Sequence, residues 1–218
     1  MMNLPLINIL TRTSNRPNGF DITYNSVKNQ TYKNIKHIVS YDNEKDLSYI
    51  SKYDGLHLIK IDKDKLISED QSPNPRTGKY SPHNLYFNEM IKIIDEGWVI
   101  YLDDDDRFTD KYCVEKIVNT INNSDDDTLI FWQFKLGNNL ILPPIINDNN
   151  PPQLYKIGGG AITFNIKHKK HATWDAWKCS DYRVINNLYN NLNKVKFINE
   201  VLVLAPKPGS GNKVDIYI

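Results

Sequence analysis

The chain has 218 residues, of which 40% are hydrophobic and 24% charged, a balance typical of folded globular proteins. Its 27 Lys and Arg against 26 Asp and Glu leave a net charge of +1, so nothing in the charge favours a nucleic-acid partner. No apolar run approaches the ~18 residues that a transmembrane segment needs, and the N-terminus does not resemble a signal peptide. The two cysteines form no CxxC motif, so we expect a cytoplasmic protein without a disulfide scaffold or structural zinc.

The first sixty residues alternate between short apolar runs and helical patterns. In order, they predict a strand, a helix, a strand, a short helix and a strand, over residues 6–10, 18–31, 34–40, 47–52 and 56–61. Strands that alternate with helices in this way predict an α/β fold with a mainly parallel sheet and helices on its faces.

The next segment, residues 62–81, is polar and contains two prolines, so we expect a functional or mobile loop. The remaining elements are predicted as a helix, a strand, a helix, a strand and a final helix, over 85–94, 98–102, 113–122, 129–136 and 181–192.

Neither an internal repeat nor a linker poor in apolar residues divides the chain. We therefore predict a single domain over residues 1–218. In this prediction the domain has a first half, residues 1–106, and a second half, residues 107–218.

Four consecutive carboxylates, Asp103–Asp106, come directly after the apolar strand at 98–102. Ligands of an open α/β sheet bind beyond the carboxyl ends of its strands, where this run must lie. Adjacent like charges repel unless a cation or hydrogen-bond donors offset them, and Mg²⁺ or Mn²⁺ prefers oxygen ligands. The pattern therefore predicts a metal site. A second run, Asp125–Asp127, follows polar residues, and we expect it to be a solvated turn.

Together with three earlier segments, this run resembles family 2 glycosyltransferases with the GT-A fold, including small viral or bacterial members. The matching segments are Ile9–Arg16, Ser26–Tyr32, Ile38–Asn43 and Val99–Phe108, the last similar to the family's DxD region. The resemblance covers about residues 6–108 well. It implies a metal-dependent, inverting transfer of a sugar from a nucleotide diphosphate, with a UDP-sugar as the expected donor, to a hydroxyl of a glycan or glycoprotein.

The same resemblance assigns residues to the donor site. Asp42 would accept a hydrogen bond from the nucleobase imide, although a turn cap is the simpler role for an Asp at that position. The other residues expected to line the nucleotide pocket are Thr11, Arg12, Thr13 and Arg16, and Arg16 has the alternative role of a surface cation.

Within the carboxylate run, the resemblance implies that Asp103 contacts the ribose and that Asp103 and Asp105 hold the Mn²⁺ or Mg²⁺ ion. Asp104 would also contact the donor, and the sequence does not rank it against Asp106. Gly159, in the glycine run 158–160, resembles part of the family's donor-sugar loop, and a flexible turn is the alternative.

On the acceptor side, Asp181 stands at the start of a predicted helix, where the family has its general base. The preceding residue is Ser180, where the family has a Glu. Asp181 could instead only cap its helix, and Asp175 is the competing base. The basic stretch with His168 and His171 is expected to be a solvated loop.

Two other classes of protein remain open from the sequence. One is a nucleotidyltransferase that uses the carboxylates for two-metal chemistry, although residues 11–19 contain a single glycine and not a glycine-rich phosphate loop. The other is a non-catalytic relative that binds a glycan or a nucleotide. Turnover of a UDP-sugar with Mn²⁺ would distinguish the enzyme from both.

Overall fold

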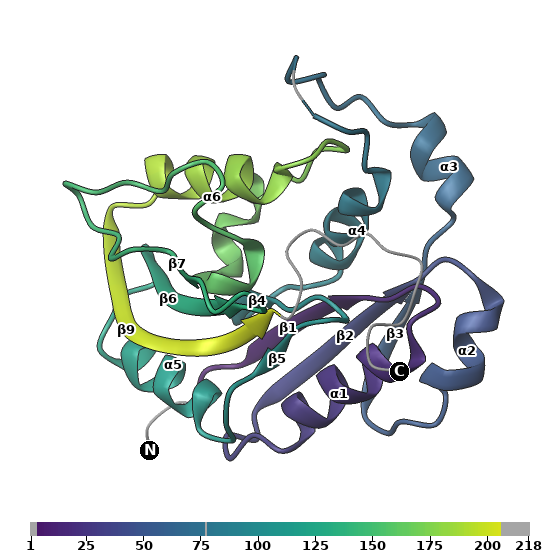
Figure 1. Ribbon diagram of the computed structural model, residues 1–218, viewed down its shortest axis with the longest axis horizontal. Helices are drawn as coiled ribbons and strands as arrows, with labels where there is room; N and C mark the ends of the chain where they lie inside the picture. Colours follow the sequence, from purple (N-terminus) through teal and green to yellow (C-terminus); the bar gives the residue numbers. More distant parts are fainter. Residues whose placement is uncertain (1–3, 77, 206–218) are drawn as a thin grey trace.

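The computed structural model describes residues 4–76 and 78–205. Within these ranges, nine strands form one sheet in the order β3-β2-β1-β4-β8-β6-β9-β5, with β7 paired to β6 (Figure 1). The strands are β1 (Ile7–Arg12), β2 (Ile35–Tyr41), β3 (Leu56–Lys60), β4 (Trp98–Tyr101), β5 (Arg107–Phe108), β6 (Thr128–Leu136), β7 (Ile141–Leu142), β8 (Ile162–Asn165) and β9 (Lys194–Ala205).

The first four strands in this order are parallel, which confirms the predicted α/β fold. In register, β1 pairs with β2 on one side and with β4 on the other, and β2 pairs with β3. The strands beyond β4 make the sheet mixed, because β8 is antiparallel to both β4 and β6.

Helices cover both faces of the sheet. In Figure 1, α4 and α6 lie above the strands, and α1 and α5 lie below them. The α-helices are α1 (Pro17–Lys28), α2 (Glu44–Ile50), α3 (Lys63–Ser68), α4 (Tyr86–Lys92), α5 (Cys113–Asn122) and α6 (Ser180–Asn191). Three short 3₁₀ segments are η1 (Pro82–Leu85), η2 (Gly159–Ala161) and η3 (Ile166–His171). Among the described residues, no helix is long and apolar enough to cross a bilayer.

Helix α1 shows why the local sequence places the nearby loop so firmly. Pro17 occupies its first turn, where the missing backbone N–H costs nothing. Its buried face includes Phe20, Tyr24 and Val27, at the spacing expected of one side of a helix. Phe20 and Tyr24 join a small, mostly aromatic cluster with residues of β2 and α2, so α1 is anchored to both elements.

Among the elements that the sequence did not predict are one helix and one long strand. Helix α3 lies inside the polar segment that was expected to be a loop, and the Asp62 side chain caps it by accepting from the Lys65 N–H. It has no buried residue, so it shows no apolar periodicity. Strand β9 was not predicted either, because few of its residues other than Leu202 and Val203 are buried.

This topology brings three loops to one edge of the sheet. In the parallel register Leu10 of β1 lies beside Ile38 of β2 and Tyr101 of β4, so all three strands end on the same side. The segments after them, residues 13–16, 42–43 and 102–106, therefore meet at that edge.

Candidate functional site

The carboxylate run forms a tight turn at the end of β4. The backbone N–H of Asp106 donates to the carbonyl of Asp103 over 3.0 Å. From α1, the hydroxyl of Thr23 donates to the Asp106 carbonyl over 2.6 Å. A buried helix residue thus fixes the backbone of the turn that carries the four carboxylates.

Two arginines bind the run, Arg12 from the end of β1 and Arg16 from the loop after it. Arg16 Nη1 lies 2.9 Å from Asp104 Oδ1 and 3.0 Å from Asp105 Oδ2. Arg12 donates through Nε and Nη2 to the two oxygens of Asp103 over 2.8 and 3.1 Å. Both predicted nucleotide-pocket arginines are therefore close to the carboxylates.

The electrostatics of the run leave an excess of negative charge. Burial, as the largest cause, raises the pKa of Asp104 to about 7, and Arg16 opposes this rise. The pKa values of Asp105 and Asp106 are also raised, first by burial and then by neighbouring carboxylates. The run has four carboxylates against two guanidinium groups. Its ligand atoms are all oxygens, which suit a hard divalent cation.

The protein does not supply a complete metal site by itself. In the ranges that the structure covers, no three Asp, Glu, His or Cys side chains are grouped so as to hold a metal ion. Asp103 and Asp105 are the candidates, with side chains that are 35% and 15% exposed. A cation there would need further ligands from its substrate, as Mg²⁺ does when it binds phosphates.

Asp42 lies on the neighbouring loop, after β2. Its Oδ2 accepts a hydrogen bond from the Tyr86 hydroxyl over 2.8 Å, whereas Oδ1 is buried and has no hydrogen-bond partner among the described residues. It borders a cavity of about 570 Å³, which is also lined by Lys60, Ile61, Asp62, Lys63 and Asp64.

The two predicted threonines point into the protein instead. Both side chains are buried. The Thr11 hydroxyl lies 2.9 Å from Nε2 of His37, and the Thr13 hydroxyl lies 2.9 Å from the Tyr49 hydroxyl. These residues support the loop rather than present their hydroxyls at the cavity.

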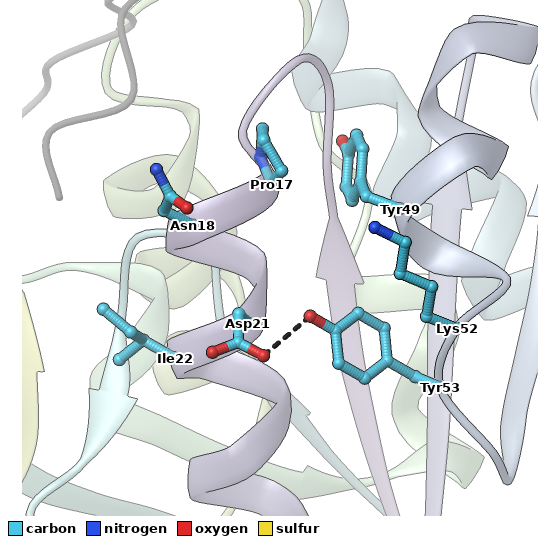
Figure 2. A pocket seen from close by; sticks show the side chains of 7 residues that line it. All are labelled: Pro17, Asn18, Asp21, Ile22, Tyr49, Lys52 and Tyr53. Carbon is cyan, nitrogen blue, oxygen red and sulfur yellow. Dashed lines mark hydrogen bonds between the residues drawn. The ribbon is translucent and has the colours of Figure 1, made fainter. Parts of the chain in front are cut away.

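A second hollow, of about 370 Å³, lies between α1 and α2. Figure 2 shows it, with the hydroxyl of Tyr53 directed at Asp21 over 2.7 Å. Its other lining residues are Pro17, Asn18, Ile22, Tyr49 and Lys52. It contains none of the predicted site residues, so it is separate from the carboxylate site.

From the second half of the chain, Asp181 lies near the carboxylate run. It lies in the first turn of α6, and its Oδ1 accepts the Tyr182 N–H over 2.8 Å. Burial, as the largest cause, raises its pKa. The glycine loop 158–160 links the two places, because Gly158 lies beside Asp181 Oδ2 and Gly160 lies beside Asp106 Oδ2.

The glycine loop passes between these two groups. A side chain at Gly160 would place its Cβ 3.3 Å from Asp106 Oδ2, and one at Gly158 would lie 3.9 Å from Asp181 Oδ2. A Cβ at the predicted donor-loop residue, Gly159, would meet the Trp174 ring at 3.2 Å. Small residues are therefore needed where the backbone passes the two carboxylates.

Asp175, the competing base, is already bound. Both of its oxygens accept hydrogen bonds from Arg183, at 2.5 and 2.6 Å. Oδ1 also accepts the N–H of Trp177 over 2.9 Å. This carboxylate holds the loop before α6 in place.

Sequence reasoning missed Asn84, which joins the two halves of the site. Its Oδ1 accepts from Arg12 over 2.8 Å, and its Nδ2 donates to the carbonyl of Trp177 over 2.9 Å. It lies in η1, next to His83, whose pKa is lowered to about 4, mainly by burial and then by Arg12. His83 is nevertheless solvent-accessible, as expected of a side chain in a cleft. No motif marked either residue.

The basic stretch lies elsewhere. His168 Nε2 is 3.0 Å from Asp127, and Lys167 also pairs with Asp127. Residues 166–171 follow β8 at the end of the sheet where β4 begins, since Asn165 pairs with Trp98. His168 is thus placed at the opposite end of β4 from Asp103.

The sheet order, the carboxylate turn and helix α6 together define the GT-A fold. The sequence itself matches no protein-family profile and no curated protein. Solved structures do match. S. aureus TarS 1–349 in complex with UDP-GlcNAc has a TM-score of 0.71 and 15% identity, covering 98% of this chain and 62% of that 1–349 chain.

A mannosyltransferase, PcManGT from Pyrobaculum calidifontis in complex with GDP-Man and Mn²⁺, has a TM-score of 0.64 and 12% identity. The match covers 96% of this chain and 59% of that one. The chain therefore spans about three fifths of the TarS 1–349 chain and of PcManGT, and 36% of the longer TarS structure. At these identities the likeness establishes the fold alone.

Proposed function

We propose that the chain is a metal-dependent, inverting glycosyltransferase that moves a sugar from a nucleotide diphosphate to a hydroxyl of a glycan or glycoprotein. The observation that carries this proposal is that one glycine loop passes both groups of carboxylates. Gly160 lies beside Asp106 of the carboxylate run, and Gly158 lies beside Asp181, the candidate base. A donor-side carboxylate and a candidate base thus lie around one cleft.

The donor would lie along the strand ends, with its base in the cavity beside Asp42 and its ribose near Asp103. Asp103 and Asp105 would hold a Mn²⁺ or Mg²⁺ ion, which when bound neutralises charge on the diphosphate. Arg16, between Asp104 and Asp105, keeps these carboxylates in place. The similar structures were solved with a UDP-sugar and a GDP-sugar, so the fold by itself leaves the base open.

Asp181 would take the proton from the acceptor hydroxyl. Its raised pKa makes it a stronger base than an ordinary Asp. Asp175 is less suited, because its oxygens are occupied by Arg183 and Trp177. With the base and the diphosphate on opposite sides of the sugar, a single displacement inverts the anomeric centre.

The test measures melting temperature and release of the nucleoside diphosphate with a panel of nucleotide sugars, with and without Mn²⁺. A ligand at about 100 times its Kd stabilises the folded protein by about 2.7 kcal/mol. We expect a Mn²⁺-dependent shift with one donor class, and slow release of the diphosphate. Binding without any release would favour a non-catalytic relative. Release of pyrophosphate from a nucleoside triphosphate would favour a nucleotidyltransferase.

Asp105→Ala is the matching variant. It should fold like the wild type and lose the Mn²⁺-dependent part of UDP binding, as measured by calorimetry. Asp126→Ala, in the second carboxylate run, is the control and should leave UDP binding unchanged. If Asp105→Ala binds UDP as tightly as the wild type in Mn²⁺, Asp105 is not a metal ligand.

A further inference from the structure

Asp42 is held by a tyrosine from another element. Tyr86 is the first residue of α4, is 3% exposed, and donates its hydroxyl to Asp42 Oδ2 over 2.8 Å. The second oxygen, Oδ1, is buried and has no hydrogen-bond partner in the described ranges. The carboxylate therefore has one oxygen committed to Tyr86 and one buried acceptor that lacks a donor, which is costly unless a ligand supplies one.

The surroundings of Asp42 suit a nucleobase. The carboxylate borders the cavity of about 570 Å³, whose wall includes one apolar residue, Ile61. From the start of α3, the amine of Lys63 lies 3.7 Å from Asp42 Oδ2. An acceptor and a flexible cationic donor therefore stand side by side at the cavity.

As a hydrogen-bond acceptor, Asp42 distinguishes uracil and guanine from cytosine and adenine. An ionised Asp accepts hydrogen bonds and donates none. Uracil and guanine present a ring N–H on their pairing edge, whereas cytosine and adenine present an unprotonated ring nitrogen there. A carboxylate facing that nitrogen would leave two acceptors opposed, and such unpaired polar contacts reject a ligand strongly. Asp42 thus suits uracil or guanine.

The number of Asp42 oxygens available to the base distinguishes uracil from guanine. Guanine presents two neighbouring donors, N1–H and the N2 amino group, which match both oxygens of a free carboxylate. Uracil presents one donor, N3–H, between two carbonyls, which match one oxygen and a neighbouring amine. With Tyr86 on Oδ2 and Lys63 beside it, Asp42 fits the uracil pattern.

We propose that Tyr86 is a positioning residue that sets the base specificity of the donor site, so that a uracil nucleotide binds in preference to a guanine nucleotide. This inference rests on the proposed function and adds to it the residue that selects the donor. Tyr86 acts through Asp42: its hydroxyl holds the carboxylate plane and keeps one oxygen from a second donor of the base.

Calorimetry with UDP and with GDP, both in Mn²⁺, tests the inference on the wild type and on Tyr86→Phe. The wild type should prefer UDP by about tenfold or more. In Tyr86→Phe the carboxylate is free to turn and to offer both oxygens. We expect UDP to bind about fivefold more weakly, the worth of one hydrogen bond, and GDP to bind more tightly, so the preference falls by about tenfold.

The control is Tyr53→Phe, which removes another hydrogen bond from a tyrosine to an aspartate, the one to Asp21 in the separate hollow of Figure 2. It should leave the ratio of UDP to GDP affinity unchanged. An unchanged ratio in a folded Tyr86→Phe, or a wild type that prefers GDP, would overturn the inference while leaving the proposed function intact.

If Tyr86→Phe does not fold, two measurements on the wild type alone test the inference. The first is the ratio of UDP to GDP affinity. The second uses 3-methyl-UDP, which lacks the N3–H and should bind about tenfold or more weakly than UDP. Equal binding of UDP and 3-methyl-UDP would overturn the inference. If neither UDP nor GDP binds in Mn²⁺, the proposed function fails and the inference fails with it.

Discussion

Asp181 and Asp175 both lie near the start of α6, and their partners distinguish them. Asp181 has one backbone donor at Oδ1, whereas Asp175 is bound by Arg183 through both oxygens. We expect Asp181→Asn to lower the rate of sugar transfer by about 10²–10⁴-fold, the usual worth of a positioned base. Donor binding should remain, because the predicted nucleotide contacts lie in the other half.

Asp175→Asn is the comparison variant. It weakens the bond to Arg183 and should lower the melting temperature, with a much smaller effect on the transfer rate of the folded protein. The measurements are UDP release and UDP affinity for each variant. Normal turnover in Asp181→Asn, with lost turnover in a folded Asp175→Asn, would move the assignment of the base to Asp175.

His37 gives a prediction about pH and stability. It is buried beneath the loop after β1, and burial lowers its pKa to about 3. The unfolded chain takes up a proton near pH 6.5 and the folded protein does not, so stability is lost as pH falls below about 6.5. Between about pH 7.5 and pH 4.5 this protonation of the unfolded chain at His37 lowers the free energy of unfolding by about 2–3 kcal/mol.

His37→Gln removes that contribution. Although the variant is less stable than the wild type near neutral pH, the gap in unfolding free energy should narrow by about 2–3 kcal/mol at about pH 4.5. Urea denaturation at both pH values measures it. The exposed His57→Gln on β3 should keep a constant gap from the wild type, and parallel curves for His37→Gln would contradict the prediction.

At the residue scale, the sequence predicted the position of the carboxylate run better than its contacts. Asp103–Asp106 could be placed because an apolar strand leads straight into them, and a strand end has a known location in an α/β sheet. The bond between Arg12 and Asp103 joins residues 91 positions apart. Nothing in a local pattern specifies which carboxylate an arginine will meet, so the inward-facing threonines and Asn84 could not be predicted either.

At the scale of elements, prediction succeeded where burial was strong. Strand β4 is buried along its whole length, and its apolar run was plain in the sequence. Strand β9 was not predicted, because it is long and mostly half-buried and pairs with β6 through an irregular register. Its position depends on that partner, so periodicity alone does not reveal it. Helix α3 is stabilised by its cap and not by a buried face.

The turn before β4 depends on a single glycine. Gly97 has φ of 92°, and an added Cβ would lie 2.4 Å from the carbonyl oxygen of Leu6. That oxygen also accepts the N–H of Trp98, so it cannot move without disturbing the entry to β4. Gly97→Ala should therefore cost about 3–5 kcal/mol of unfolding free energy, from backbone strain plus the clash.

Gly55→Ala is a matched control for Gly97→Ala. Gly55 also has a positive φ, of 76°, but an added Cβ would meet no atom within 4 Å. Only the conformational strain remains, which is about 1 kcal/mol. Denaturant unfolding of both variants measures the difference, and equal losses would show that the contact with Leu6 is relieved by a small shift.

At the scale of the whole molecule, the two predicted halves are joined in three ways. One hydrophobic cluster runs from β1 and β4 through α5 to β6 and α6. Strand β8 of the second half pairs with β4 of the first half, antiparallel, from Trp98 to Ile100. Asn84 bridges Arg12 and the carbonyl of Trp177. Such continuity favours a single folding unit.

We therefore expect one cooperative unfolding transition, with the same midpoint by tryptophan fluorescence and by far-ultraviolet circular dichroism. Asn84→Ala should lower both midpoints together. It leaves a guanidinium N–H of Arg12 without its acceptor and removes one donor to the Trp177 carbonyl, which keeps the N–H groups of Ser180 and Arg183. The expected cost is about 1–3 kcal/mol. Asn25→Ala, on the exposed face of α1, should change the free energy of unfolding by no more than about 0.5 kcal/mol. Two separate midpoints in the wild type would show that the halves fold independently, and a split that arises only in Asn84→Ala would make this one side chain the link between them.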